Sequence, residues 1–175
     1  NGSPIKMSTR KANFITLEEL IKEVGVDAVR FFFIMRSMNS HLNFDLDIAK
    51  EKSEKNPVYY IQYAHARICT VINKADIEID NPDLKLLNQG DDIKLIYKLL
   101  DFENIVHKLK DTLEPQMLSN YLHDLAALFH KYYAHNRIIT ENMELSKARL
   151  VLIKATKIVI KNGLNILGIS APESM

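Results

Sequence analysis

The scarcity of helix-breaking residues is the feature that most constrains how this chain can fold. Five Gly and five Pro occur in 175 residues, and they gather near the ends and between stretches with helical periodicity. Because Gly and Pro are the residues that most often interrupt helices, the stretches between them can form long helices. We find no alternation of apolar and polar residues typical of strands. The sequence therefore predicts an all-α helical bundle.

Capping residues and breakers predict where the helices begin and end. Thr16 and Glu19 have the spacing of a capping box. Pro57 follows Asn56 at a first helical position, where proline is tolerated. Gly163 is expected near the C-terminal cap of the last long helix. The predicted helices cover residues 16–24, 27–35, 45 or 47 to 54, 57–75, 91–110, 115–138 and 145–162, with a linker at 80–91.

The helix predicted from residue 57 carries two stripes on different faces. One broad apolar face predicts the side that packs on the core, and it holds Val58, Ile61, Ala64, Ile68, Val71, Ile72 and Ile79. The second stripe recurs at spacings of three, four and seven residues, and it holds Asn56, Tyr60, Tyr63, Arg67, Thr70 and Lys74. Since this stripe lies well away from the apolar one, we expect its tyrosines to project from the bundle beside cations.

Such a stripe suits unpaired nucleotides, because aromatic rings stack on any base while cations meet phosphates. Tyr60 and Tyr63 could equally pack against a neighbouring helix, since tyrosine is common at helix contacts. Two further rows of basic residues and histidines are weaker signals, because such rows are usually the solvated face of a helix. They are Lys147, Lys154, Lys157 and Lys161, and His123, His130 and Arg137.

Several classes of protein are disfavoured by what the chain lacks. A net charge of +1 means that any basic surface is local. The single cysteine, Cys69, excludes an internal disulfide and is expected to be a buried, inert thiol. We find no metal-ligand spacing, no glycine-rich phosphate loop and no set of nucleophile and base. Without a stretch long enough to span a bilayer, the chain is predicted to be a cytoplasmic binding module.

Five blocks of sequence follow one another in a recognisable order along the whole chain. They are Lys6-Met7-Ser8-Thr9-Arg10-Lys11, Asp27 to Ser37, His41 to Asp47, Asn56 to Arg67 and Gly168 to Met175. The first block is similar to the KMSKS signature loop, and Asp27-Ala28-Val29-Arg30 is similar to the DALR motif of an anticodon-binding domain. Together the blocks resemble the arginyl-tRNA synthetase family, in class I of the aminoacyl-tRNA synthetases.

The resemblance implies roles in ATP binding for the first block. Lys6 and Ser8 would contact the ATP phosphates as catalytic residues of the signature loop, and Met7 would lie in the same nucleotide-binding loop. Thr9 departs from the second Lys common in the family, and Ala12 replaces a usual Gly. ATP with Mg²⁺ is implied for the full-length enzyme, with no cofactor expected on this chain and no metal site.

The resemblance also implies which residues meet RNA. Tyr60, Tyr63 and Arg67 would face the anticodon loop of the tRNA for arginine, and Met175 is a candidate contact at the C-terminus. Arg30 is expected to be structural. The remaining aromatic and basic candidates are Lys74 and Tyr133, with Phe129 and Tyr132 in the same aromatic cluster and Phe129 also a possible core residue.

Three segments and one function follow from the resemblance. Residues 1–15 would hold the KMSKS-type loop at the end of a catalytic domain, residues 16–54 the stem-contact helices, and residues 55–175 the anticodon-binding bundle. The chain would position tRNA for ATP-dependent arginylation by an arginine–tRNA ligase and would be inactive alone. The full enzyme would bind arginine and ATP elsewhere and would be a monomer. A non-catalytic RNA-binding or regulatory domain and a helical protein-interaction scaffold remain as alternatives.

Overall fold

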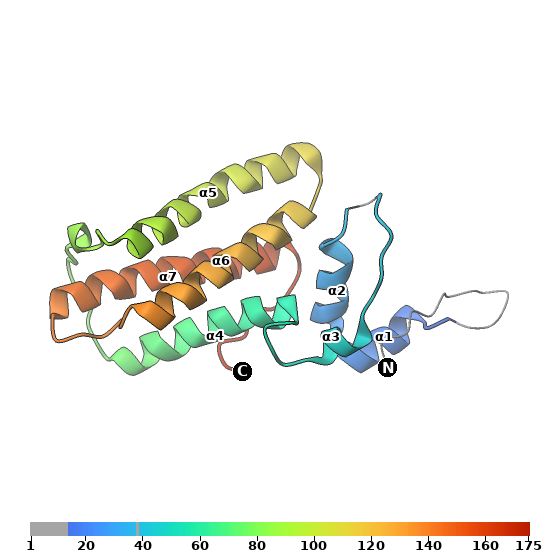
Figure 1. Ribbon diagram of the computed structural model, residues 1–175, viewed down its shortest axis with the longest axis horizontal. Coiled ribbons are helices and arrows are strands. Elements are labelled where there is room, and N and C mark those ends of the chain that lie inside the picture. Colours follow the sequence, from blue (N-terminus) through green and yellow to red (C-terminus); the bar gives the residue numbers. More distant parts are fainter. Residues whose placement is uncertain (1–13, 38) are drawn as a thin grey trace.

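The computed structural model describes residues 14–37 and 39–175, and in these ranges it contains helices and no strand. Three short helices come first: α1 (Leu17–Val24), α2 (Val26–Ile34) and α3 (Leu46–Lys50). Four long helices then form a bundle in which α5 lies on one side and α4 on the other, with α6 and α7 between them (Figure 1). The long helices are α4 (Pro57–Ala75), α5 (Gly90–Thr112), α6 (Gln116–His135) and α7 (Met143–Ile166). The predicted all-α class is confirmed.

Local capping explains the helix starts. The Thr16 side chain accepts a hydrogen bond from the Glu19 backbone N–H, and the Glu19 carboxylate accepts one from the Thr16 N–H at 2.8 Å, so the predicted capping box is present. Asp45 caps α3 by accepting from the N–H groups of Asp47 and Ile48. Such side chains satisfy backbone donors that a helix start leaves free.

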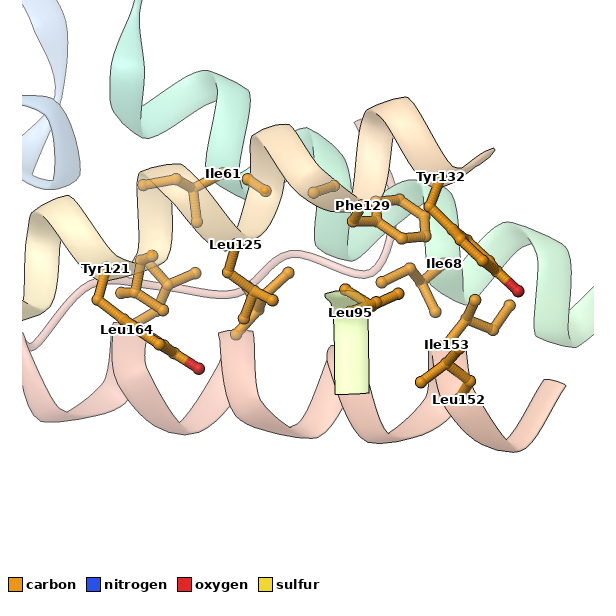
Figure 2. Close-up of a cluster of buried hydrophobic side chains, with 14 of the residues drawn as sticks. Ile61, Ile68, Leu95, Tyr121, Leu125, Phe129, Tyr132, Leu152, Ile153 and Leu164 are labelled. Atoms are coloured by element: carbon orange, nitrogen blue, oxygen red, sulfur yellow. The ribbon is translucent and has the colours of Figure 1, made fainter. Parts of the chain in front are cut away.

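The core lies where α4, α6 and α7 meet, with α5 contributing from the side (Figure 2). Its largest fully buried side chains include Phe129, Tyr132 and Ile68. The Tyr132 hydroxyl donates to the carboxylate of the fully buried Asp92 at 2.8 Å, which joins α6 to the start of α5. Within the described residues, no helix is long and apolar enough to cross a membrane.

The third helix is shorter than predicted, because Asn56 uses its side chain to hold the chain beyond it. The Asn56 amide donates to the carbonyls of Ala49 and Glu51, both at 3.0 Å, while its oxygen caps α4 at Tyr59. Glu51 takes an extended backbone, which ends α3 four residues before the predicted Glu54. The linker is also more ordered than predicted, with a 3₁₀ turn at Leu84–Leu86 and a buried Leu87.

The last helix ends later than predicted, because α7 runs to Ile166 and not to residue 162. Gly163 lies in its last turn, near the C-terminal cap as predicted, and a Cβ atom there would stand 2.6 Å from a methyl carbon of the buried Leu122 on α6. The glycine therefore allows the close approach of two helices. Two residues beyond Ile166, Gly168 has a φ of 66°, and the Ile169 N–H donates to the Leu164 carbonyl, which completes a Schellman motif.

Candidate functional site: an aromatic and arginine cluster beside a tethered C-terminal tail

A group of side chains from α4 and α6 surrounds Arg67. We call it the aromatic–arginine cluster, and it consists of Tyr59, Tyr60, Tyr63, Arg67, His130 and Tyr133. The guanidinium carbon of Arg67 lies 4.5 Å from the centre of the Tyr63 ring and 5.2 Å from that of Tyr133. One of its terminal nitrogens also donates to the Tyr63 hydroxyl at 2.8 Å. Arg67 is thus a partly exposed cation held between two π faces, one from each helix.

The tyrosines of α4 form a continuous ring array with α6. The rings of Tyr59 and Tyr63 are stacked, with centres 6.0 Å apart and planes inclined by 12°. Tyr60 contacts His130 on α6 at 4.5 Å between ring centres, and Tyr63 stacks on the same histidine at 5.8 Å. Tyr59 and Tyr63 meet because they lie four residues apart on α4, and Tyr60 and Tyr63 both meet His130 because they lie three residues apart on the side of α4 that faces α6.

The expectation that the tyrosine stripe projects clear of the bundle is wrong for Tyr60. Its ring is half-buried against His123 and His130, and burial raises the pKa of its hydroxyl. The alternative, in which the tyrosines pack against a neighbouring helix, is confirmed by these contacts. Asn56, the first member of the predicted stripe, is also not exposed, because it is buried as the N-cap of α4. Tyr63, Arg67 and Tyr133 keep the exposure that ligand contact needs.

The remaining sequence candidates divide into core and surface. Phe129 and Tyr132 are buried and belong to the core. Lys74 is exposed on the same stripe of α4 as Arg67, about two turns beyond it. Tyr133 is 37% exposed and flanks Arg67 from α6. Cys69 is buried as predicted, and burial raises the pKa of its thiol.

Sequence reasoning missed His130 as a member of the cluster. Its seven-residue spacing from His123 and Arg137 suggested a solvated face, yet its ring is partly buried between the tyrosines of α4. Its Nδ1 lies 3.3 Å from a terminal nitrogen of Arg67. The sequence shows the seven-residue row that contains His130. Only the packing of α6 against α4 shows that His130 faces the tyrosines of α4.

Beyond α7 the chain forms a tethered tail, residues 168–175, that four side chains of α2 and α4 hold in place. Arg30 donates to the Gly168 carbonyl, which confirms the structural role expected for it. Asp27 accepts from the Ser170 hydroxyl and, at 3.3 Å, from the Ser170 N–H. The two charged residues of the Asp-Ala-Val-Arg block therefore fix the tail to α2.

Two residues of α4 continue this tether. The Gln62 amide nitrogen donates to Asp27 at 2.9 Å and to the Ser170 carbonyl at 3.0 Å. The fully buried His65 donates from Nδ1 to the Pro172 carbonyl at 2.8 Å. Burial, aided by Lys157 and Lys161, lowers the pKa of His65, so the ring is neutral at neutral pH. The tail is thereby held along α4 by groups that stay uncharged or buried.

The tail and the cluster occupy different sides of α4. At 100° per residue, His65 lies about 140° around the helix from Tyr60. Met175 is 54% exposed at the end of the tail. None of the tail's hydrogen bonds described above reaches the cluster, so a shared role for Met175 and Arg67 stays a prediction. Lys6, Met7 and Ser8 lie outside the described residues.

The remaining charged groups hold no metal-binding arrangement in the part of the chain that the structure describes. No group of three or more His, Cys, Asp or Glu side chains converges there. Ion pairs on the surface are mostly local, such as Lys22 with Glu18 and Lys147 with Glu144. The cluster around Arg67 is therefore the candidate site whose chemistry is most distinctive, and that chemistry is stacking and hydrogen bonding.

Comparison with known proteins agrees with this arrangement. The DALR anticodon binding domain family matches residues 61–175. The chain is 52% identical to the arginine–tRNA ligase of Salinibacter ruber, covering 98% of this chain and 31% of that protein. It is 47% identical to the arginine–tRNA ligase of Carboxydothermus hydrogenoformans, covering 99% and 32%. The chain thus spans about a third of the length of these relatives.

A solved structure gives the same picture of the fold. The arginyl-tRNA synthetase of Thermus thermophilus superposes with a TM-score of 0.78 at 30% sequence identity. The match covers 95% of this chain and 29% of that one. The helical arrangement that places α4 beside α6 is therefore shared with a much longer protein.

Proposed function

Because the chain belongs to the DALR anticodon binding domain family, we propose that its aromatic–arginine cluster binds the anticodon loop of a tRNA for arginine. The observation that carries the proposal is Arg67, whose guanidinium is held between the rings of Tyr63 and Tyr133. Rings and guanidinium planes at a surface stack on unpaired bases, which an anticodon loop presents.

The low net charge of the chain favours RNA binding by stacking over binding by a broad basic surface. With a net charge of +1, the chain has no overall field that attracts RNA. Binding must then depend on local cations, of which Arg67 and the exposed Lys74 lie on the same stripe of α4. Stacking depends less on salt than phosphate contacts do, so selectivity should persist as salt is raised.

For the whole protein we propose arginine–tRNA ligase activity in the cytoplasm, with arginine, ATP and Mg²⁺ as its small ligands. The support is the name shared by relatives that match nearly all of this chain. In that protein the roles of Lys6 and Ser8 at the ATP phosphates, and of Met7 beside them, follow from the resemblance of the first block. A monomeric state and the inactivity of this chain alone are part of the same proposal.

The proposal predicts selective RNA binding by this chain. We expect an arginine tRNA to bind about tenfold or more tightly than the same tRNA with its anticodon loop replaced, since each stacked base contributes about 1–3 kcal/mol. Fluorescence anisotropy of the two labelled transcripts over a salt series measures this ratio. Equal affinities for the two RNAs at every salt concentration would overturn the anticodon assignment, and a failure to bind either RNA would favour a helical protein-interaction scaffold.

A further inference from the structure

His130 uses both ring nitrogens within the aromatic–arginine cluster. Its Nδ1 faces a terminal nitrogen of Arg67 at 3.3 Å, and its Nε2 faces the backbone carbonyl of Tyr60 at 3.3 Å. A guanidinium can only donate and a carbonyl can only accept. One neutral tautomer satisfies both partners: Nε2 carries the proton and donates to Tyr60, while the lone pair of Nδ1 accepts from Arg67.

Protonation of His130 is incompatible with this arrangement. A second proton on Nδ1 would point at an N–H of Arg67, and two positive charges would meet at hydrogen-bond distance. The groups that face the ring from α4 are Arg67, Tyr60 and Tyr63, while Phe129 contacts it within α6. Burial, and then the charge of Arg67, lower the pKa of His130, and the Tyr60 carbonyl offsets part of that shift.

His130 also restricts where the guanidinium of Arg67 can lie. One terminal nitrogen is held by the Tyr63 hydroxyl and the other by His130, so the plane is fixed from two directions. Arg67 has a long side chain with many rotamers, and ordering it before a ligand arrives removes a cost that binding would otherwise carry. Without the acceptor at Nδ1, one of these two anchors is lost.

We propose that neutral His130 is the positioning residue for Arg67, and that protonating it weakens RNA binding at the cluster. This inference rests on the proposed function, since it assigns His130 a part in the same RNA contact. The direction is unusual, because an added positive charge ordinarily strengthens the attraction between a protein and RNA phosphates. When His130 is protonated, the affinity lost because Arg67 is no longer ordered exceeds the affinity gained from the added charge.

The test compares wild type with two variants at about pH 7.5 and about pH 4.5, at constant ionic strength. In His130→Gln, the amide oxygen can accept from Arg67 and the amide nitrogen can donate to Tyr60, and the side chain does not titrate. In His130→Leu, the space is filled without an acceptor. Anisotropy with the arginine tRNA gives the affinity, and circular dichroism checks the fold of each variant at both pH values.

Because the pKa of His130 lies below its ordinary value, we expect the wild-type affinity to fall only at the lower pH, by about tenfold once the ring is charged, as for a hydrogen bond to a charged group. His130→Gln should bind more tightly than His130→Leu at the higher pH and change little on acidification, while His130→Leu should bind weakly at both. His65 is unchanged in all three proteins, so any acid effect from the tail is common to them. An equal acid loss in wild type and His130→Gln would overturn the role of His130.

The ring nitrogen shifts of wild-type His130 test the inference without RNA and without a variant. The Nε2–H tautomer at neutral pH is the expected result, and the Nδ1–H tautomer or a charged ring would overturn the proposal. If wild type fails to prefer the arginine tRNA at the higher pH, the proposed function itself fails, and this inference fails with it. A preference at the higher pH combined with the wrong tautomer overturns the positioning role alone.

Discussion

Replacing Arg67 with alanine should weaken binding of the arginine tRNA by about tenfold to a hundredfold, the range for losing one charge-assisted or stacking contact. Arg67 contacts Tyr63, Tyr133 and His130 together. Its removal therefore takes away a cation and also leaves two tyrosine rings and a histidine without their common partner. Anisotropy at a fixed low salt concentration measures the change.

Two further variants distinguish position from charge. Lys110→Ala removes the same unit charge from the exposed C-terminal end of α5, on the side of the bundle opposite α4 (Figure 1). It should leave affinity within about twofold of wild type, because a distant surface charge is screened. Arg67→Lys should fail to restore binding, since an ammonium lacks the planar fork that stacks between rings. Equal losses in Arg67→Ala and Lys110→Ala would contradict the assignment.

Replacing Asp27 with alanine should lower the free energy of unfolding by about 2 kcal/mol, because hydrogen bonds to charged groups contribute about 1.5–3 kcal/mol. Asp27 accepts from the Ser170 hydroxyl, the Ser170 N–H and the Gln62 amide. Its loss leaves Ser170 of the tail and the buried Gln62 of α4 without their shared acceptor. Urea denaturation followed by circular dichroism measures the change.

The matched control is Asp111→Ala, which removes an exposed carboxylate from the last turns of α5. That change should lie within about 0.5 kcal/mol of wild type, as is usual for a surface substitution. Combining Asp27→Ala with Ser170→Ala completes a double-mutant cycle, which should show a loss smaller than the sum of the single losses. Strict additivity would mean that the Asp27–Ser170 contact contributes nothing to stability.

What the sequence predicts well is local along the chain. The capping box at Thr16 and Glu19 and the start of α4 at Asn56 and Pro57 depend on residues within one turn of each other. The all-α class follows from breakers and periodicity, which are also local. The stripe containing Tyr63 and Arg67 is likewise a property of one helix, so helical spacing alone predicts its members.

What the sequence could not predict is how one helix meets another. The packing of Gly163 against Leu122 joins two helices, and the two residues are far apart along the chain. The tether between Asp27 and Ser170 spans 143 positions. His130 belongs to the cluster only because α6 packs beside α4. Each of these contacts depends on tertiary packing, which periodicity in one segment does not specify.

The central claim is that the cluster around Arg67 contacts the anticodon loop, and a titration with the isolated anticodon stem-loop of an arginine tRNA tests it most directly. Side-chain resonances of Arg67, Tyr63 and Tyr133 are followed by NMR as the hairpin is added, with Lys110 as the internal reference because α5 lies on the side of the bundle opposite α4. The predicted result is saturable shifts at the three cluster residues and little change at Lys110. Saturable binding of the hairpin that leaves Arg67, Tyr63 and Tyr133 unshifted would contradict the claim.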